Sequence, residues 1–145
     1  MIVEPPDRAT VIGAIMPDVL SMQLDVVGDE DEVGFARVVC EQSGTCAGLL
    51  VAKELFGRVG ARVRPLVAEG DTVSPDQAVA EVGGPLAAIR GAAPLALTWL
   101  HRLSAVASGA TSPEPGDALD AWAARLSAPG AVRHDGPSFR MEFEG

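Results

Sequence analysis

The 145-residue chain contains no tyrosine, one lysine (Lys53) and two cysteines, and aromatic residues make up only 4% of it. Hydrophobic residues nonetheless account for 48%, which suffices for a packed core and is too much for a disordered chain. The core must therefore be aliphatic, built mainly from Ala, Val and Leu. The length fits one domain of ordinary size, and the abundance of Arg, Ala, Gly and Pro is typical of a GC-rich bacterial genome.

Positive charge is also scarce, since the formal net charge is -9 and the pI is about 4.5. An acidic surface repels nucleic-acid phosphates and anionic lipid headgroups, so neither is an expected partner. No apolar run reaches the roughly 18 to 20 residues that span a bilayer, and the first residues lack the basic region and apolar core of a signal peptide. We therefore expect a cytoplasmic protein.

Metal-ligating residues are few. Cys40 and Cys46 alone do not make a zinc site, which takes four ligands, and His101 and His134 lie far away in sequence. The acidic run at 28–32 lacks EF-hand spacing and is interpreted as a solvated loop. We expect no metal and no cofactor, and we interpret the cysteines as small buried residues, with redox or nucleophilic thiol chemistry as the alternative.

Hydrophobic periodicity organises the chain from residue 34 onward, whereas the preceding proline-punctuated residues carry no clear pattern. Strands are expected at 34–41, 61–67, 77–82, 86–89 and 138–144, and helices at 48–59, 92–107 and 118–127. This order predicts an α+β fold with a single-layer, mostly antiparallel sheet packed against helices. We divide the chain into an N-terminal arm with the acidic loop (1–33), an α+β domain (34–107), and a linker, added helix and C-terminal strand (108–145).

The helix at 92–107 is apolar over more than one face. Leu95, Trp99 and Leu103 all lie on it, and Pro94 suits its first turn, where a missing N–H costs little. Such a helix is buried by its own domain, by a partner, or by both. We expect a homodimer through the helix around Trp99.

Three stretches of the chain share their order and spacing with a known family. They are 38–56, with Gly44, Ala47 and Gly48; 67–85, with Gly70, Asp71, Val73, Gln77, Gly84 and Pro85; and 97–108, with Leu97, Leu100, Arg102, Leu103, Ser104 and Ala107. Through them, residues 34–107 resemble the N-terminal domain of quinolinate phosphoribosyltransferase. The resemblance implies that family's α+β fold.

The departures from the family pattern concern its activity. The resemblance implies an Arg just before the long helix that reaches the substrate carboxylate of the neighbouring subunit, but Ala93 and Pro94 stand at those positions here. Pro94 cannot supply a guanidinium fork. The 145 residues also stop before the catalytic barrel and its Thr-Arg-Lys-Thr motif. We therefore expect no phosphoribosyl transfer by the chain alone. The hairpin tip at 82–85 carries no lysine, which excludes a biotinyl or lipoyl carrier.

Five residues are candidates for a site. His101 is a candidate acid or base, although a helix residue hydrogen-bonded to backbone is the preferred interpretation. Arg37, Arg62 and Arg64 lie on candidate strands, and the spacing of the last two places them on one face, where they could hold an anionic ligand. Arg102, beside His101, is a further candidate. A solvated sheet face is the alternative for the three strand arginines.

Two classes of function remain open. In the first, the chain is a reused scaffold that binds or acts on a small molecule, as a cofactor-independent cyclase or isomerase of bacterial specialised metabolism would. In the second, it is a non-catalytic subunit that docks on a barrel-containing phosphoribosyltransferase. An exposed apolar patch on Leu95, Trp99 and Leu103 would favour the second class.

Overall fold

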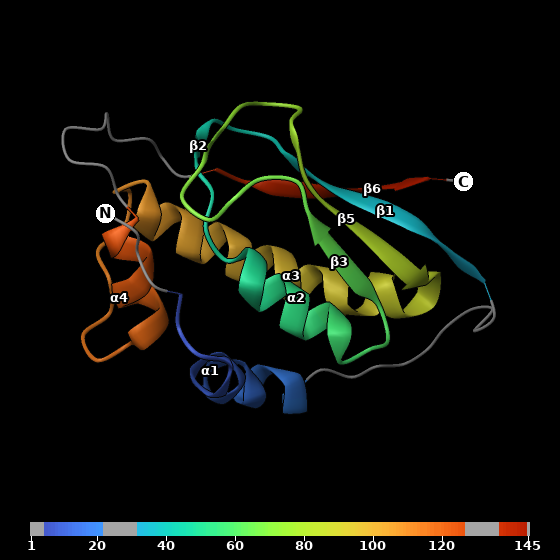
Figure 1. The fold of residues 1–145 in the computed structure, drawn as a ribbon, viewed down its shortest axis with the longest axis horizontal. Coiled ribbons are helices and arrows are strands. Elements are labelled where there is room, and N and C mark those ends of the chain that lie inside the picture. Colours follow the sequence, from blue (N-terminus) through green and yellow to red (C-terminus); the bar gives the residue numbers. More distant parts are fainter. Residues whose placement is uncertain (1–4, 22–31, 127–136, 145) are drawn as a thin grey trace.

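The computed structural model describes residues 5–21, 32–126 and 137–144. Figure 1 shows a sheet with helices packed on one face. The helices are α1 (Arg8–Ser21), α2 (Leu49–Gly57), α3 (Leu86–Ala107) and α4 (Ala118–Arg125); the strands are β1 (Val33–Cys40), β2 (Gly44–Thr45), β3 (Arg62–Pro65), β4 (Thr72–Val73), β5 (Ala78–Pro85) and β6 (Phe139–Glu144). The main sheet has the order β3-β5-β1-β6, all antiparallel, and β2 pairs with β4 separately. The predicted α+β class is confirmed.

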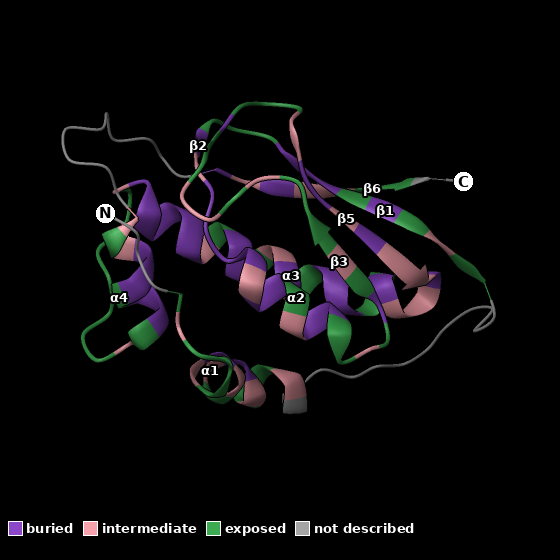
Figure 2. Cartoon of the chain, in the orientation of Figure 1, coloured by how far each residue is buried: buried purple, intermediate pink, exposed green. Residues whose placement is uncertain are grey.

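The central strand β1 shows why one face of the sheet is covered. Ala36, Val38 and Cys40 are buried and face the helices, whereas Phe35 and Arg37 on the other face are exposed; the alternation ends at Val39, which is also buried. Figure 2 shows this alternation along the strand. Because successive side chains of a strand point to opposite faces, the small apolar residues form the core and the other face remains open.

Helix α3 runs along the covered face and is longer than its sequence pattern predicts. It begins at Leu86, so the strand expected at 86–89 is wrong, and Pro94 lies in the interior of the helix rather than in its first turn. Its missing N–H leaves the carbonyl of residue 90 without an intrahelical partner. Pro94 is exposed, so water can satisfy that carbonyl.

The apolar faces of α3 are buried by the domain itself. Trp99 is 5% exposed and Leu103 is fully buried, while Leu95 is half-buried. The exposed patch that would favour the docked-subunit class is therefore not present at these residues. A homodimer through this helix stays a prediction, and Trp99 contributes to the chain's own core.

Residues 44–48, which contain the matched Gly44, Ala47 and Gly48, are hydrogen-bonded to α3 through two serines one turn apart. The Ser104 hydroxyl accepts the N–H of Ala47 at 2.9 Å and donates to its carbonyl at 3.0 Å, and the Ser108 hydroxyl accepts the N–H of Thr45 at 2.9 Å. Gly48 has φ +108 and approaches the backbone of α3, where a Cβ would lie 3.4 Å from a main-chain oxygen. These matched family positions therefore hold the fold together.

Three elements lie outside residues 34–107: α1 before them, and α4 and β6 after them. Helix α1 packs on α2 and α4; its pattern was obscured by Pro17, which lies inside it. Asp117 caps α4 as expected, accepting two backbone N–H groups at 3.0 Å. The predicted C-terminal strand is also confirmed, since β6 pairs with β1. Residues 28–31 of the acidic run and His134 lie outside the described residues.

Candidate functional site

The open face of the sheet brings together three of the predicted ligand-binding residues. Across the strands, Glu81 of β5 lies opposite Arg64 of β3 on one side and opposite Arg37 of β1 on the other. In the adjoining row, Gly83 lies between Arg62 and Phe35. The register therefore forms an Arg-Glu-Arg row beside an Arg-Gly-Phe row on the same exposed face.

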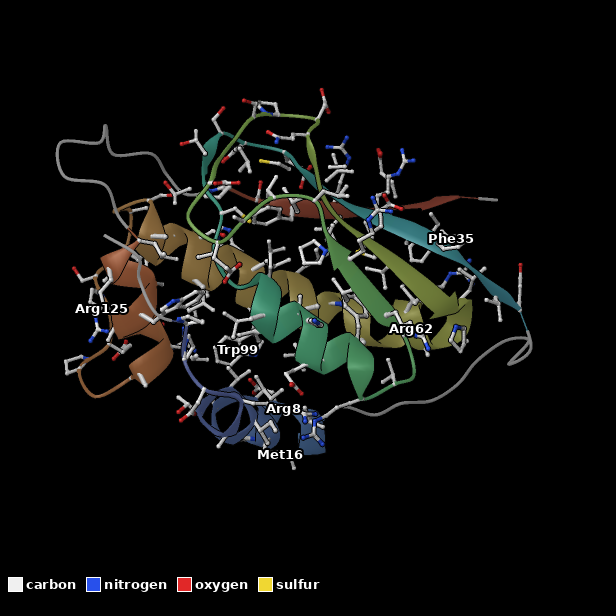
Figure 3. The ribbon with its side chains drawn as sticks, in the orientation of Figure 1. Arg8, Met16, Phe35, Arg62, Trp99 and Arg125 are labelled. Carbon is white, nitrogen blue, oxygen red and sulfur yellow. The ribbon has the colours of Figure 1, made fainter. Side chains whose placement is uncertain are left out.

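These two rows border a hollow of about 560 Å³. It is lined by Phe35, Gly60, Arg62, Val63, Arg64, Glu81, Gly83 and Gly84. Figure 3 shows Phe35 and Arg62 at the end of the sheet far from α4, which carries Arg125. The hollow is open to solvent, and its lining combines an aromatic ring, two guanidinium groups and one carboxylate.

Gly83 is the residue that lets Phe35 lie over the sheet. A Cβ at Gly83 would come within 3.0 Å of the Phe35 ring, so any other residue would displace that ring. Phe35 remains 60% exposed, which is unusual for so large an apolar side chain. The ring therefore presents an uncovered apolar surface beside two positive charges.

The lining of the hollow carries a net positive charge, although the net charge of the whole chain is negative. Arg62 and Arg64 outnumber the one lining carboxylate, Glu81, in a chain of net charge -9. Neither side chain of these arginines makes an ion pair or hydrogen bond to another described residue. Two guanidinium groups are thus available to a ligand.

The structure places His101 and Arg102 elsewhere, on α3. His101 is exposed, and its Nδ1 lies 3.1 Å from the carbonyl oxygen of Pro137, which agrees with the backbone-bonded interpretation. Arg102 donates to Asp117 at 2.6 Å, lies 3.2 Å from Asp120, and stacks 4.9 Å from the centre of the Trp99 ring. These contacts tie α4 to α3, so an anion at Arg102 would compete with two carboxylates.

A second hollow, of about 650 Å³, lies between α1 and α2. Arg8, Lys53 and Arg58 contribute to its lining together with Glu54, which accepts a hydrogen bond from Arg8 at 2.6 Å. The sequence pattern did not reveal it, because α1 was not predicted. Its basic groups are partly neutralised by that ion pair, whereas Arg62 and Arg64 form no such ion pair with another described residue.

Glu69 is a carboxyl group whose pKa is raised into the neutral range by its surroundings. Its carboxylate accepts the N–H groups of Gly48 at 3.2 Å and Leu49 at 2.8 Å, at the start of α2. Burial raises the pKa of Glu69 to about 7, against the opposing effect of these hydrogen bonds. Since Gly48 has no side chain to cap the helix, Glu69 supplies the missing cap from a distance in sequence.

The cysteines take the structural role expected of them. Cys40 and Cys46 are buried and are not disulfide-bonded. Burial raises the pKa of both thiols, which opposes formation of a reactive thiolate. In the parts of the chain that the structure describes, no three His, Cys, Asp or Glu residues gather as metal ligands, and none of the helices is long and apolar enough to cross a membrane.

Sequence reasoning missed Phe35 and Gly83 as parts of the site. A signal was available, because Phe35 is two residues from Arg37 and must share its face. That Phe35, Gly83 and Arg62 lie opposite one another could not be predicted from the sequence, since it depends on the register between three strands.

Solved structures share this fold over nearly the whole chain. The nicotinate-nucleotide pyrophosphorylase from Francisella tularensis matches with a TM-score of 0.77 and 16% identity, covering 92% of this chain and 56% of that one. NadC from Streptococcus pyogenes matches with 0.76 and 16%, covering 90% and 55%, and the Ehrlichia chaffeensis nicotinate-nucleotide pyrophosphorylase with 0.70 and 12%, covering 92% and 57%. The chain thus spans little more than half the length of these enzymes, and the match extends beyond residues 34–107. No curated protein matches it.

The sequence itself matches one family model. That model describes the N-terminal domain of quinolinate phosphoribosyl transferase, and it aligns with residues 18–104, more than half of the chain. The matched range includes Gly48, which lies against the backbone of α3, and Ser104 of α3, which is hydrogen-bonded to Ala47. This chain belongs to the family of quinolinate phosphoribosyl transferase N-terminal domains.

Proposed function

We propose that this domain binds a small anionic molecule with an apolar or aromatic body on the open face of its sheet. The observation that carries the proposal is the hollow in which Arg62, Arg64 and Phe35 meet. The resemblance implies a charged substrate-binding motif where Ala93 and Pro94 stand, inside α3 rather than before it, so we expect no phosphoribosyl transfer by the 145 residues themselves.

The lining matches the chemistry of such a ligand. A guanidinium group binds a carboxylate through two parallel hydrogen bonds, and two arginines spaced two residues apart present two such forks on one face. The exposed ring of Phe35 offers a flat apolar surface for stacking. Glu81, which lies between Arg64 and Arg37 in the Arg-Glu-Arg row, accepts a hydrogen bond from a donor on the ligand.

The same lining favours binding over catalysis. A reaction here, such as a cyclisation or isomerisation in bacterial specialised metabolism, would rest on orientation of the bound molecule by Phe35 and the arginines. His101, the candidate acid or base, lies on α3 and is not in the lining. Its replacement by Ala therefore leaves both binding and any turnover unchanged.

Binding is tested by titrating the chain with aromatic carboxylates. Quinolinate and benzoate are suitable probes, with cyclohexanecarboxylate to separate stacking from charge, and backbone amide shifts in NMR spectra report the position. We expect Arg62→Ala or Arg64→Ala to weaken binding about 10- to 100-fold, since a hydrogen bond to a charged group contributes roughly 1.5–3 kcal/mol. Arg125→Ala, which removes the same charge from α4, serves as the control.

Two outcomes would contradict this function. One is that the probes shift no amide of β3 or β5. The other is that Arg125→Ala weakens binding as much as Arg62→Ala, which would reduce the effect to net charge.

The docked-subunit hypothesis remains the second candidate. It is supported by the family match, by the 56% coverage of a full-length pyrophosphorylase, and by the exposure of Val33 (70%) and Phe35 (60%) on the open sheet face. A barrel-containing phosphoribosyltransferase would cover both residues. Co-elution with such a barrel that is lost in Val33→Asp, with small-molecule binding retained, would favour this candidate.

A further inference from the structure

Strand β6 forms one edge of the sheet. The N–H and C=O groups on its outer side are therefore not paired with any other described strand. The sheet order places β6 next to β1 alone, and Figure 1 shows it along that edge. The N–H of Glu41 donates to the carbonyl of Ser138 at 2.8 Å, so Ser138 directs its backbone toward β1. Because backbone direction alternates along an antiparallel strand, Phe139, Met141 and Phe143 direct theirs away from β1.

We infer that β6 pairs with β6 of a second copy of this chain, antiparallel and centred on Met141. In this register Met141 lies opposite Met141, and Phe139 lies opposite Phe143 of the second copy. All three positions direct their N–H and C=O groups outward, so each pair exchanges two hydrogen bonds. The two sheets become one continuous sheet related by a two-fold axis.

The side chains of β6 are self-complementary in the same register. Arg140 lies opposite Glu142 of the second copy, and Glu142 lies opposite Arg140, on the open face of the sheet. These are the closely spaced pairs without backbone hydrogen bonds, where opposite charges stabilise the contact. Within one chain Arg140 contacts Asp76 at 3.0 Å and Glu142 at 3.3 Å, and in the dimer Glu142 of the second copy provides it with a further carboxylate.

Charge selects this register over its neighbours. Centring the contact on Arg140 sets Arg140 opposite itself, and centring it on Glu142 sets Glu142 opposite itself. Centring it on Phe143 sets Glu142 opposite Glu144. Like charges directly opposite one another destabilise a strand pair, so only the register centred on Met141 combines full overlap with opposite charges.

Apolar contacts on the other face agree with this arrangement. Phe143 is 40% exposed although the Arg90 guanidinium lies 5.1 Å from its ring centre. Pairing sets it opposite Phe139 of the second copy, and aromatic cross-strand pairs stabilise sheets. A long edge strand that exposes an aromatic residue is a site of strand addition unless it is covered.

The inference goes beyond ligand binding, since neither Arg140 nor Glu142 lines the hollow. A two-fold axis perpendicular to the sheet keeps the open faces on the same side. The dimer therefore presents two copies of the hollow on one surface. Loss of dimerisation and loss of ligand binding are separately measurable.

The test uses two single charge reversals and their mixture. Sedimentation velocity over a dilution series should show the unaltered chain at about twice its 14.9 kDa mass at high concentration. Arg140→Glu alone and Glu142→Arg alone should both remain monomeric, because each places like charges opposite one another. The equimolar mixture should form a heterodimer, detected by native mass spectrometry, because each Glu then faces an Arg.

The mixture distinguishes a disrupted interface from a misfolded variant, since neither variant can regain dimerisation in a mixture unless it is folded. Three results would overturn the inference: an unaltered chain that stays monomeric at its highest soluble concentration, an Arg140→Glu variant that dimerises as strongly as the unaltered chain, or a mixture without heterodimer. The second result would transfer the contact to another surface, such as the helix around Trp99.

Discussion

Replacing Ser104 by Ala should destabilise the domain far more than its size suggests. The Ser104 hydroxyl is fully buried and bonds both the N–H and the C=O of Ala47, which is 57 residues away in sequence. The variant leaves the N–H and C=O groups of Ala47, which is fully buried, without this partner. An unsatisfied buried polar group costs roughly 1–3 kcal/mol, so we expect a loss of about 2–4 kcal/mol.

The measurement is urea unfolding followed by circular dichroism. A matched variant on the same helix is Thr98→Ala, whose hydroxyl donates to the carbonyl of Pro94 at 2.8 Å but is exposed. It should change the free energy of unfolding by about 0.5 kcal/mol or less. If the two variants are equally stable, the locking of residues 44–48 onto α3 does not hold the domain together.

Two further predictions concern α2 and α3. The pKa of Glu69 is raised to about 7 from an ordinary 4.5, so the folded state holds its proton more tightly. The contribution of Glu69 to stability should therefore fall as pH rises from about 4.5 to about 7, by about 3 kcal/mol. Glu69→Gln should flatten that slope in unfolding curves taken across this range, and an unchanged slope would show that the carboxyl is not perturbed. Pro94 is exposed inside α3, so Pro94→Ala should raise the free energy of unfolding by about 1–2 kcal/mol, less than the roughly 3 kcal/mol propensity difference because proline also restricts the unfolded chain; a lower midpoint in thermal unfolding would mean that the proline ring packs favourably.

The local elements show how far periodicity reaches. The strand at β1 was predictable from its β-forming residues, and α2 was predictable because Leu49, Ala52 and Phe56 recur at helical spacing. Helix α3 was predicted to start too late, because the pattern before Pro94 allowed either a short strand or a helix, and only packing against the sheet decides between them. Helix α1 was missed because Pro17 interrupts its pattern, although its contacts with α2 and α4 support it in the folded chain.

The candidate site was likewise predictable only in part from the sequence. The residue spacing placed Arg62 and Arg64 on one face, and the family motifs indicated the fold. The structure alone decided that Phe35, Gly83 and Arg62 lie side by side, and that Arg102 is held by Asp117 and Asp120.

The sequence by itself determined which residues are apolar, which face of each strand they occupy, and to which family the domain is similar. Those properties are local, because side-chain alternation and helical spacing follow from backbone geometry. The tertiary structure decided the register between β3, β5 and β1, the hydrogen bonds between Ser104 and Ala47, and the position of β6 at an edge of the sheet. These depend on contacts between residues distant in the chain, whose energies are settled only when the whole core packs.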